Sequence, residues 1–440
     1  MNHRVAVRRR RGNRRLASTL AVLGLIAVAC GSDDDASSPT EAPATTTAEA
    51  PATTTADAGT TADAGTTADA GTTADAGTTA DAGPEGGVSP AKLEELKAEV
   101  AAAAALPKFE AQGPAFSVAA LAGKKIFSMP VASSLKGCDD MSKHVVEIAK
   151  SIGMTDSTYF QNDGGPAAWQ QGMEQAINGG YDGVALVCGI DPNALTPQME
   201  AARQAGIAVV DMHLSDVSVP DDPLIAGQTD GEFNRSMKMG VYQALIDSGG
   251  EPIDVFLITS NENPPSLTME QAVKDTFAEL CTACTVTSQN VPIPDWFGGA
   301  GQSTIDGALA ANPDLAAIFT VYDFMAPVVT GSILANHSDA KVYAFGGDDP
   351  VVATMLQEGS PMGTDMGPGF LWMAYSGADQ LFRAMAGEPV IPGAQAFAPY
   401  RLWNAGNAAE KTENEGFGDS FIEGYYGLWQ GAENAERYKP

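Results

Sequence analysis

The sequence predicts an α/β protein with two Rossmann-like lobes, each built on a parallel sheet, preceded by a signal peptide and a disordered tether. Three observations support this prediction. Apolar strand patterns alternate with helical patterns from Gly123 onward, the alternation restarts after a long helical pattern at 230–248, and residues 31–88 carry no pattern that could bury a core. Alternating strands and helices are typical of βαβ units with a parallel sheet. Two such series are long enough for two lobes of ordinary domain size.

The first 29 residues have the features of an export signal. Seven arginines precede an apolar or small run from Leu16 to Ala29. A membrane span needs about 20 apolar residues, so a shorter run behind a basic stretch is typical of a cleaved signal peptide. Residues 27–30 read Ala-Val-Ala-Cys, which resembles a bacterial lipobox. The resemblance implies a lipid on Cys30 that anchors the mature chain to the outer face of the cell membrane. The alternative is an ordinary cleavage site with a leftover cysteine.

Residues 30–88 are predicted to be a solvated tether. Five copies of Thr-Thr-Ala-Asp-Ala-Gly cover Thr54 to Gly83, and this composition lacks the apolar residues that a core needs. The chain carries a net charge of −30, and the leader contributes seven of its positive charges. Because nucleic-acid binding depends on clustered Lys and Arg, this acidity excludes a nucleic-acid partner.

The globular part begins with a helix and linker over 89–122, since Ser89-Pro90 is a typical helix start. Strands are predicted in the first half at 125–131, 157–162, 183–188, 208–213 and 224–228, with helices at 139–152, 166–178 and 192–205. After the 230–248 helix, strands are predicted at 254–259, 285–291, 316–322, 341–346 and 362–366.

Polar residues collect where these strands end. Open parallel sheets bind ligands at the carboxyl ends of their strands, and two facing lobes would form a cleft there. The candidate ligand-binding residues in the first half are Ser134, Trp169, Asp191, Asp211, His213 and Asp230. Those in the second half are Asn261, Asp323 and Asp348. Each of them could instead be polar simply because strands end at the surface.

Several runs of sequence carry a family resemblance. Residues 180–192 read Gly-Tyr-Asp-Gly-Val-Ala-Leu-Val-Cys-Gly-Ile-Asp-Pro, and 205–210 read Ala-Gly-Ile-Ala-Val-Val. Late in the chain, Thr364 to Pro368 and Ala378 to Gly387 fit the same pattern. From Gly123 to Asn404 the chain resembles type I periplasmic binding proteins, especially sugar-type ABC transporter substrate-binding lipoproteins related to ribose-binding protein.

The resemblance implies a Venus-flytrap receptor that captures a small molecule and delivers it to an ABC transporter permease. It implies lobe crossovers near 228–229, 365–366 and 391–392. The first lobe would then contain 123–229 and 366–391, the second 230–365 and 392–405, with 406–440 as an extension. Further ligand-binding candidates from the resemblance are Trp296 as a stacking aromatic, Tyr322 in place of an amide, and Met366 at a crossover.

The family default is a sugar or polyol, but this chain departs from the family's pattern. The first-lobe aromatic pair is replaced by Ser133-Ser134-Leu135, and the helix at 269–277 lacks the expected arginine. Asp211 matches the expected acid. A ligand sensor of the same fold, feeding a membrane kinase or chemoreceptor, is the alternative function, and sequence alone does not separate it from transport.

The cysteines other than Cys30 predict two disulfides. Cys281 and Cys284 follow a helix instead of beginning one, which favours a structural bond over a redox centre. Cys138 and Cys188 follow the first and third strands, which would be sheet neighbours.

No cofactor, metal or enzymatic activity is predicted, and we expect a monomer. His144, His213 and His337 lack ligand spacing, and no nucleophile elbow is present. Near the C-terminus an aromatic residue recurs every four positions, at Phe417, Phe421, Tyr425 and Trp429. If helical, this stripe is expected to pack back onto a lobe.

Overall fold

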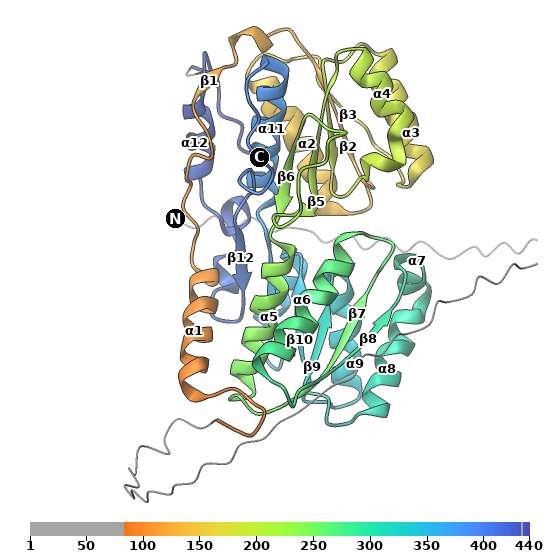
Figure 1. Ribbon diagram of the computed structural model, residues 1–440, viewed down its shortest axis with the longest axis vertical. Coiled ribbons are helices and arrows are strands. Elements are labelled where there is room, and N and C mark those ends of the chain that lie inside the picture. Colours follow the sequence, from red (N-terminus) through yellow and green to blue (C-terminus); the bar gives the residue numbers. More distant parts are fainter. Residues whose placement is uncertain (1–82, 433) are drawn as a thin grey trace, which may run out of the picture. The chain divides into compact units, whose positions relative to one another are not determined.

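The computed structural model describes residues 83–440 except 433 (Figure 1). The signal peptide, Cys30 and nearly all of the tether therefore lie outside the described residues. Within the described part, no helix is long and apolar enough to cross a membrane.

The first lobe contains a parallel sheet of five strands in the order β3-β2-β4-β5-β6. Its central strand β4 reads Gly-Val-Ala-Leu-Val and is buried throughout, as expected for a strand covered on both faces. The strands are β2 (Ile126–Pro130), β3 (Thr158–Tyr159), β4 (Gly183–Val187), β5 (Ala208–Asp216) and β6 (Gly227–Gly231). The helices are α2 (Lys136–Ser151), α3 (Pro166–Asn178), α4 (Thr196–Gln204) and α11 (Phe370–Ala386).

Two hydrophobic clusters cover the two faces of this sheet. On one face α3 and α4 pack through Met173 and Met199 against Val184 and Leu186. On the other face α2 and the late helix α11 pack together against Val187 and Met212. The first lobe therefore includes a helix that lies about 140 residues further along the chain than its last strand, β6.

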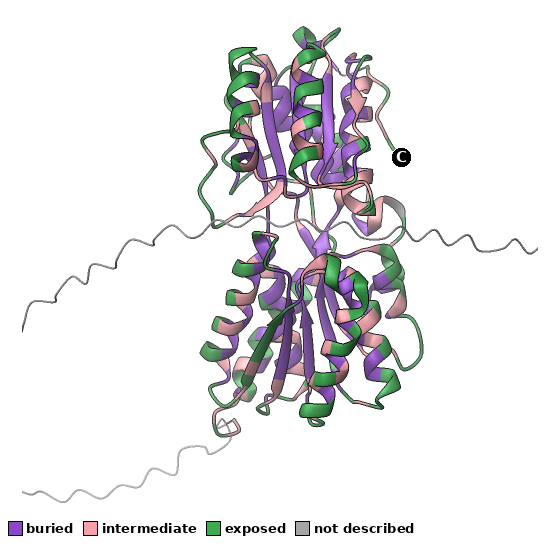
Figure 2. Ribbon diagram, turned by 90° about the vertical axis from the view of Figure 1, so that its right-hand side faces the viewer, coloured by how far each residue is buried: buried purple, intermediate pink, exposed green. Residues whose placement is uncertain are grey.

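The second lobe contains a sheet of six strands in the order β12-β11-β10-β9-β7-β8. All its neighbouring pairs are parallel except β11 with β12. The strands are β7 (Asp254–Thr259), β8 (Thr285–Asn290), β9 (Ala317–Thr320), β10 (Lys341–Phe345), β11 (Met362–Pro368) and β12 (Tyr400–Trp403). The helices are α5 (Phe233–Asp247), α6 (Pro265–Leu280), α7 (Ile293–Asp295), α8 (Gly301–Ala311), α9 (Ala326–Ala335) and α10 (Asp349–Thr354). Figure 2 shows the central strands of both lobes buried, the edge strand β8 exposed, and exposed residues along the outer sides of the helices.

The structure corrects several predicted boundaries. β6 begins at Gly227 instead of Leu224 and continues to Gly231, so the first crossover follows residue 231 and α5 starts at Phe233. β11 continues to Pro368 because it pairs with β12 up to Tyr400, which places 366–368 in the second lobe and moves that crossover to Gly369. The strand predicted at 157–162 is reduced to two residues.

The two ends of the described chain form additional elements. Helix α1 (Pro90–Ala104) packs on α5 and β12 of the second lobe. Strand β1 (Phe116–Ser117) pairs with β13 (Trp429–Gln430), and α12 (Ser420–Leu428) packs on α11 of the first lobe. The predicted aromatic stripe provides this packing, since the Phe421 ring stacks on Trp372 at 4.6 Å.

Candidate functional site

The carboxyl ends of the two sheets lie against each other. Gly189 follows β4, and a methyl group added to it would lie 3.7 Å from the side-chain oxygen of Asn263, which follows β7. The His213 ring, from β5, stacks at 6.2 Å on Phe345 at the end of β10. We call this region, where the strand ends of both lobes meet, the interlobe junction.

A column of three aromatic rings lies in the second lobe at the junction. Tyr322 stacks on Phe324 at 5.7 Å, and Phe324 stacks on Phe297 at 5.6 Å. The Tyr322 hydroxyl accepts a hydrogen bond from Ser266 at 3.0 Å, which fixes one end of the column. Phe297 at the other end is 69% exposed, so it offers a free ring face for a ligand.

Trp296, predicted to stack on a ligand, is buried in the second-lobe core with 3% exposure. It begins a π-helical turn over Trp296–Ala300, and Gly301 lies directly against its indole ring. The turn directs Trp296 inward and leaves the adjacent Phe297 outside. The sequence signal was the adjacent aromatic pair, Trp296 and Phe297. The family resemblance assigned the stacking role to Trp296 alone.

Three aspartates gather where β9 and β10 end: Asp323 and Asp348 follow these strands, and Asp365 lies within β11 beside Ala344. Asp323 accepts a hydrogen bond from the backbone N–H of Asp348 at 2.7 Å, and Asp365 accepts one from Gly347 at 3.0 Å. Burial, followed by repulsion from Asp365, raises the pKa of Asp323 well above its usual range. Burial also raises the pKa of Asp365 to about 7. With these raised pKa values, Asp323 and Asp365 hold protons part of the time at neutral pH. The cluster can therefore both donate a hydrogen bond to a hydroxyl group and accept one from it.

Sequence reasoning missed Asp365, although it lies in the Thr364 to Pro368 run that carries the resemblance. The sequence signal that could have identified Asp365 was the set of glycines near it. A methyl group at Gly346 would lie 2.2 Å from the Asp323 carboxyl carbon, and one at Gly367 would lie 1.9 Å from the Gly346 carbonyl oxygen. Glycine at both positions allows the β10 and β11 ends to close around the carboxyls.

The first lobe contributes a second pair of buried acids. Asp211 and Asp230 are 2% and 1% exposed, and each has an oxygen without a hydrogen-bond partner among the described residues. Gln228 donates to Asp230 at 2.7 Å. Burial, assisted by Asp230, raises the pKa of Asp211 well above its usual range, and burial raises the pKa of Asp230 to about 7. Both shifts favour the protonated form, and a pKa of about 7 leaves Asp230 only partly protonated near neutral pH.

His213 lies among aromatic rings from the second lobe and the hinge. Its Nδ1 lies 3.1 Å from the Tyr400 hydroxyl, and Phe233, Phe345 and Phe370 surround the imidazole. Burial lowers the pKa of His213 to about 3, so the ring is neutral. The structure thus gives His213 interlobe packing contacts.

The remaining candidates occupy varied positions. Ser134 is exposed after β2, and Asn261 is exposed after β7, where its backbone N–H donates to the side chain of Asn290 at 2.7 Å. Trp169 donates through Nε1 to the Val131 carbonyl at 2.8 Å. Asp191 caps a 3-10 turn by accepting from the Asn193 backbone at 2.9 Å. Met366 is buried in the second-lobe core, where β11 pairs with β10 and β12.

Trp169 and Asp191 therefore hold loops at the junction, whereas Met366 has a core position. Asp348 is half-buried, and burial raises its pKa. The positive charge of Lys411 and, less strongly, that of Lys136 oppose this rise. Lys136 lies on α2 of the first lobe, so a cation of one lobe is within electrostatic reach of an acid of the other.

Both cysteine pairs are bonded in the structure. Cys138 and Cys188 have Cα atoms 5.7 Å apart, and Cys281 and Cys284 have Cα atoms 5.4 Å apart. The first bond joins the start of α2 to the residue after β4, directly before Gly189 at the junction. It therefore holds two junction loops of the first lobe together.

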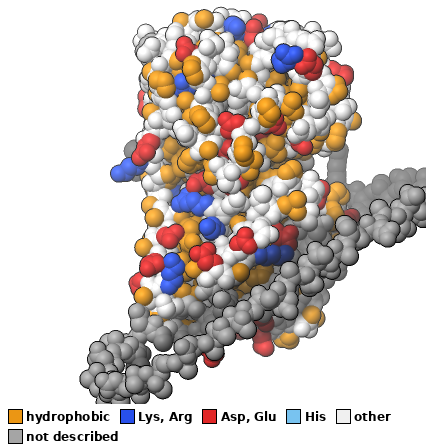
Figure 3. All heavy atoms as spheres, in the orientation of Figure 1, with side chains coloured by type: hydrophobic (Ala, Val, Ile, Leu, Met, Phe, Trp, Pro, Cys, Tyr) orange, Lys and Arg blue, Asp and Glu red, His pale blue; other side chains and the backbone are white. Residues whose placement is uncertain are grey.

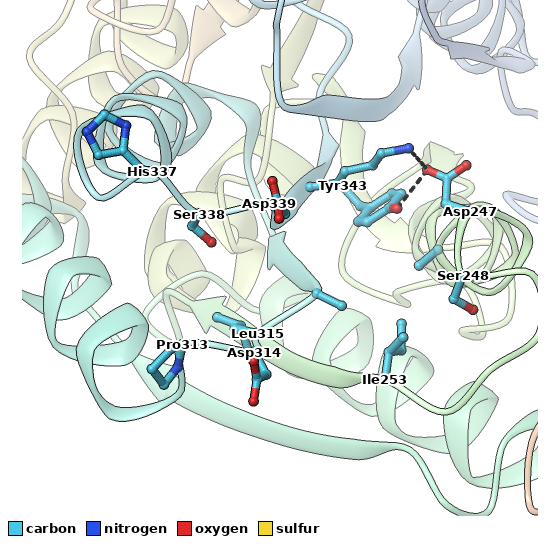
Figure 4. Close-up of a pocket in the computed structure, with 13 residues that line it drawn as sticks. Asp247, Ser248, Ile253, Pro313, Asp314, Leu315, His337, Ser338, Asp339 and Tyr343 are labelled. Carbon is cyan, nitrogen blue, oxygen red and sulfur yellow. Dashed lines mark hydrogen bonds and ion pairs between the residues drawn. The ribbon is translucent and has the colours of Figure 1, made fainter.

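A cavity of about 390 Å³ lies elsewhere (Figure 4). Asp314, Leu315, Asp339 and Lys341 line it, so it lies at the amino ends of β9 and β10, opposite the junction. Asp247 faces Lys341 there at 2.7 Å.

Over residues 83–440 except 433, no cluster of His, Cys, Asp and Glu is arranged to hold a metal ion. On the face drawn in Figure 3, Lys and Arg are scattered among acidic side chains.

Comparisons with known proteins agree with this architecture. Residues 126–389 match a family model described as a periplasmic binding protein domain. No curated protein matches the chain. Among solved structures, an ABC sugar transporter subunit from Rhodobacter sphaeroides is 16% identical, with 65% of this chain and 100% of that chain covered and a TM-score of 0.57.

Two further structures share the fold. A 5-methylthioribose transporter solute binding protein from Thermotoga lettingae, in complex with 5-methylthioribose, is 15% identical, with 70% and 95% coverage and a TM-score of 0.56. A Bacillus halodurans ABC transporter solute binding protein with bound myo-inositol is 14% identical, with 66% and 97% coverage and a TM-score of 0.55. Because the sequence identities are this low, the similarity establishes the fold alone, which is that of the type I periplasmic binding proteins.

Proposed function

The chain belongs to the periplasmic binding protein family, and from this premise we propose that it binds a sugar or polyol at the interlobe junction and delivers it to an ABC transporter permease. Members of this family bind solutes outside the cytoplasm for transport and do not convert them. The observation that carries the proposal is the presence of a stacked aromatic column together with clustered, partly protonated carboxyls that follow β9 and β10 or lie in β11.

This combination suits a hydroxyl-rich ring. The exposed face of Phe297 would cover the C–H face of the ligand, while Asp348, Asp323 and Asp365 would exchange hydrogen bonds with its hydroxyls. A hydroxyl both donates and accepts, so it matches a carboxyl cluster that holds protons. The ligands named for the similar structures, myo-inositol and 5-methylthioribose, belong to this chemical class.

Binding would be coupled to lobe closure. A solute that contacts both lobes has more contacts in the closed state, and this difference in affinity shifts the population toward closure. The permease would then recognise the closed form. No bond in the solute is made or broken in this mechanism.

A thermal-shift screen tests the proposal. Pentoses, hexoses, hexitols, cyclitols and amino acids would be added separately to the purified chain, because a ligand that binds only the folded state raises its melting temperature. We expect stabilisation by at least one sugar or polyol and a smaller rise in the Phe297→Ala variant. Stabilisation by amino acids alone would exclude the sugar and polyol class.

We further propose that the mature protein is anchored by a lipid on Cys30, a residue outside the described part. Metabolic labelling with a radioactive fatty acid is expected to label the wild-type chain and not Cys30→Ala. Equal labelling of the two would contradict the anchor.

A further inference from the structure

The lobes are joined by more than the three hinge passages of β6 to α5, β11 to α11, and α11 to β12. Within the described residues, the N-terminal segment passes from the end of α1 on the second lobe to β1 on the first, over 105–115. The C-terminal segment passes from 404–416 on the second lobe to α12 on the first. Both passages run beside the hinge.

A buried arginine in the second lobe holds both terminal segments. Arg401, on β12, is 3% exposed. Its Nε donates to the Ala104 carbonyl at 3.0 Å, and its Nη1 donates to the Gly416 carbonyl at 2.7 Å. Its guanidinium also lies 4.5 Å from the centre of the Trp403 ring and pairs with Glu410. Ala104 ends α1 and Gly416 precedes α12, so one side chain fixes the second-lobe end of both passages.

A second buried arginine does the same in the first lobe. Arg383, on α11, is 1% exposed and donates to the Pro114 carbonyl at 2.9 Å, with Phe116 packed 4.3 Å from its guanidinium. Its ion-pair partner Asp379, at 2.7 Å, accepts a hydrogen bond from Trp429 Nε1 at 2.8 Å. The pair therefore fixes the N-terminal segment through its cation and the C-terminal segment through its anion.

The passages also pack on the hinge and on each other. A methyl group at Gly113 would lie 2.3 Å from Ile391 Cδ1, and Gln112 donates to the Phe397 carbonyl, both in the α11-to-β12 hinge passage. The Phe109 ring lies 5.1 Å from Tyr425, in the space left by the missing side chain of Gly424. Pivoting of the lobes would displace these contacts.

We infer that the two terminal segments form an interlobe strap, anchored by Arg383 and Arg401, that limits how far the lobes open. Hydrogen bonds to buried charged groups are stronger than those between neutral groups, so opening that broke the anchors would be strongly disfavoured. A restricted open state raises the fraction of binding-competent molecules and slows release of a bound solute. That last consequence rests on the proposed solute-binding function, whereas the strap itself does not.

The test measures opening without any ligand. Spin labels would be placed on exposed helix positions of the two lobes, Glu174→Cys on α3 and Ala310→Cys on α8, in the full chain carrying Cys30→Ala. A specific protease sequence inserted between Glu110 and Ala111, both exposed, allows the N-terminal passage to be cut after folding. The matched control has the same insertion between Glu358 and Gly359, in an exposed turn outside the strap.

Double electron–electron resonance is expected to show a shift to longer and broader label distances after the strap is cut and no shift after the control is cut. If cutting the strap abolishes cooperative melting, the same labels are measured in Phe109→Ala, where the strap is loosened but intact, and the longer distances are expected there. Unchanged distances in the folded cut chain, or in Phe109→Ala, would overturn the strap. Because no solute is present, this outcome is independent of the thermal-shift screen.

Discussion

Asp365 lies fully buried in the middle of β11, and this position links stability to pH. Its pKa is raised to about 7 by burial, whereas the unfolded chain releases this proton near pH 4. Between these values the folded state holds a proton that the unfolded state has lost, so stability falls as pH rises from about 4 to about 7.

We predict that Asp365→Asn weakens this pH dependence, because the amide keeps the shape but cannot titrate. Urea unfolding between pH 4 and 8 would measure the free energy of unfolding of both proteins. The exposed Asp339→Asn variant is the control and is expected to keep the wild-type slope. Equal slopes for wild type and Asp365→Asn would show that the β11 carboxyl is not the titrating group.

The neighbours Trp296 and Phe297 are predicted to have opposite roles. Trp296→Ala removes a buried ring and should cost about 3–5 kcal/mol of stability. Phe297→Ala removes an exposed ring, so it should change stability by less than about 0.5 kcal/mol and weaken solute affinity about three- to tenfold. Chemical denaturation and calorimetric titration of both variants separate the two effects. A stable Trp296→Ala that lost solute binding would restore Trp296 as the stacking residue.

Single residues were the hardest feature to predict from sequence. Asp323 and Asp348 were found because they directly follow strands, and the structure brings them together. Phe297 and Asp365 were missed since their positions depend on a π-helical turn and on the extension of β11 by pairing with β12. Both are tertiary effects that local patterns do not encode.

At the scale of elements, α12 contains two glycines that test the strap packing. A methyl group at Gly424 would lie 2.2 Å from Phe109, whereas Gly427 faces open space. Gly424→Ala should therefore destabilise the protein by about 1–3 kcal/mol. Gly427→Ala should leave it unchanged or stabilise it by up to about 1 kcal/mol, because alanine favours helix. Thermal denaturation of the two variants is the measurement, and equal effects would contradict the packing of Phe109 against α12.

The two disulfides should differ in their contribution. The chain-entropy model gives about 4 kcal/mol for a bond that spans 50 residues and about 2 kcal/mol for one that spans 3. We predict that replacing Cys138 and Cys188 by serine lowers stability more than replacing Cys281 and Cys284. Guanidinium unfolding of the two double variants measures the difference. The opposite order would indicate that the Cys138–Cys188 bond is absent or strained in solution.

Buried, apolar strands were predicted well, and so was the exposed edge strand β8, whereas the edge strands β3, β6 and β12 were not. β4, β7 and β10 each contain an unbroken apolar run of at least four residues, and the sequence placed these strands within one residue. The apolar run that begins at Leu224 was assigned to a strand, but Leu224 is 39% exposed and the ladder starts at Gly227, where pairing with Val210 begins. β1 and β13 pair with each other from opposite ends of the described chain, so neither is encoded by its own segment alone.

For the whole molecule, the sequence predicted two facing α/β lobes and their family, since repeated βαβ patterns suffice for that. It did not predict that residues 105–115 and the C-terminal segment pass from one lobe to the other, because the contacts of Arg383 and Arg401 link residues that are up to about 300 positions apart. The central claim is that a solute binds at the interlobe junction and not in the 390 Å³ cavity at the opposite end of the second lobe.

Calorimetric titration with the most stabilising sugar or polyol tests this claim most directly, using wild type, the junction variant Phe297→Ala and the cavity variant Asp339→Ala. Both substituted residues are exposed, so both variants should fold normally. The expected result is a three- to tenfold loss of affinity in Phe297→Ala, from the lost ring contact, and unchanged affinity in Asp339→Ala. Full affinity in Phe297→Ala together with lost affinity in Asp339→Ala would contradict binding at the junction.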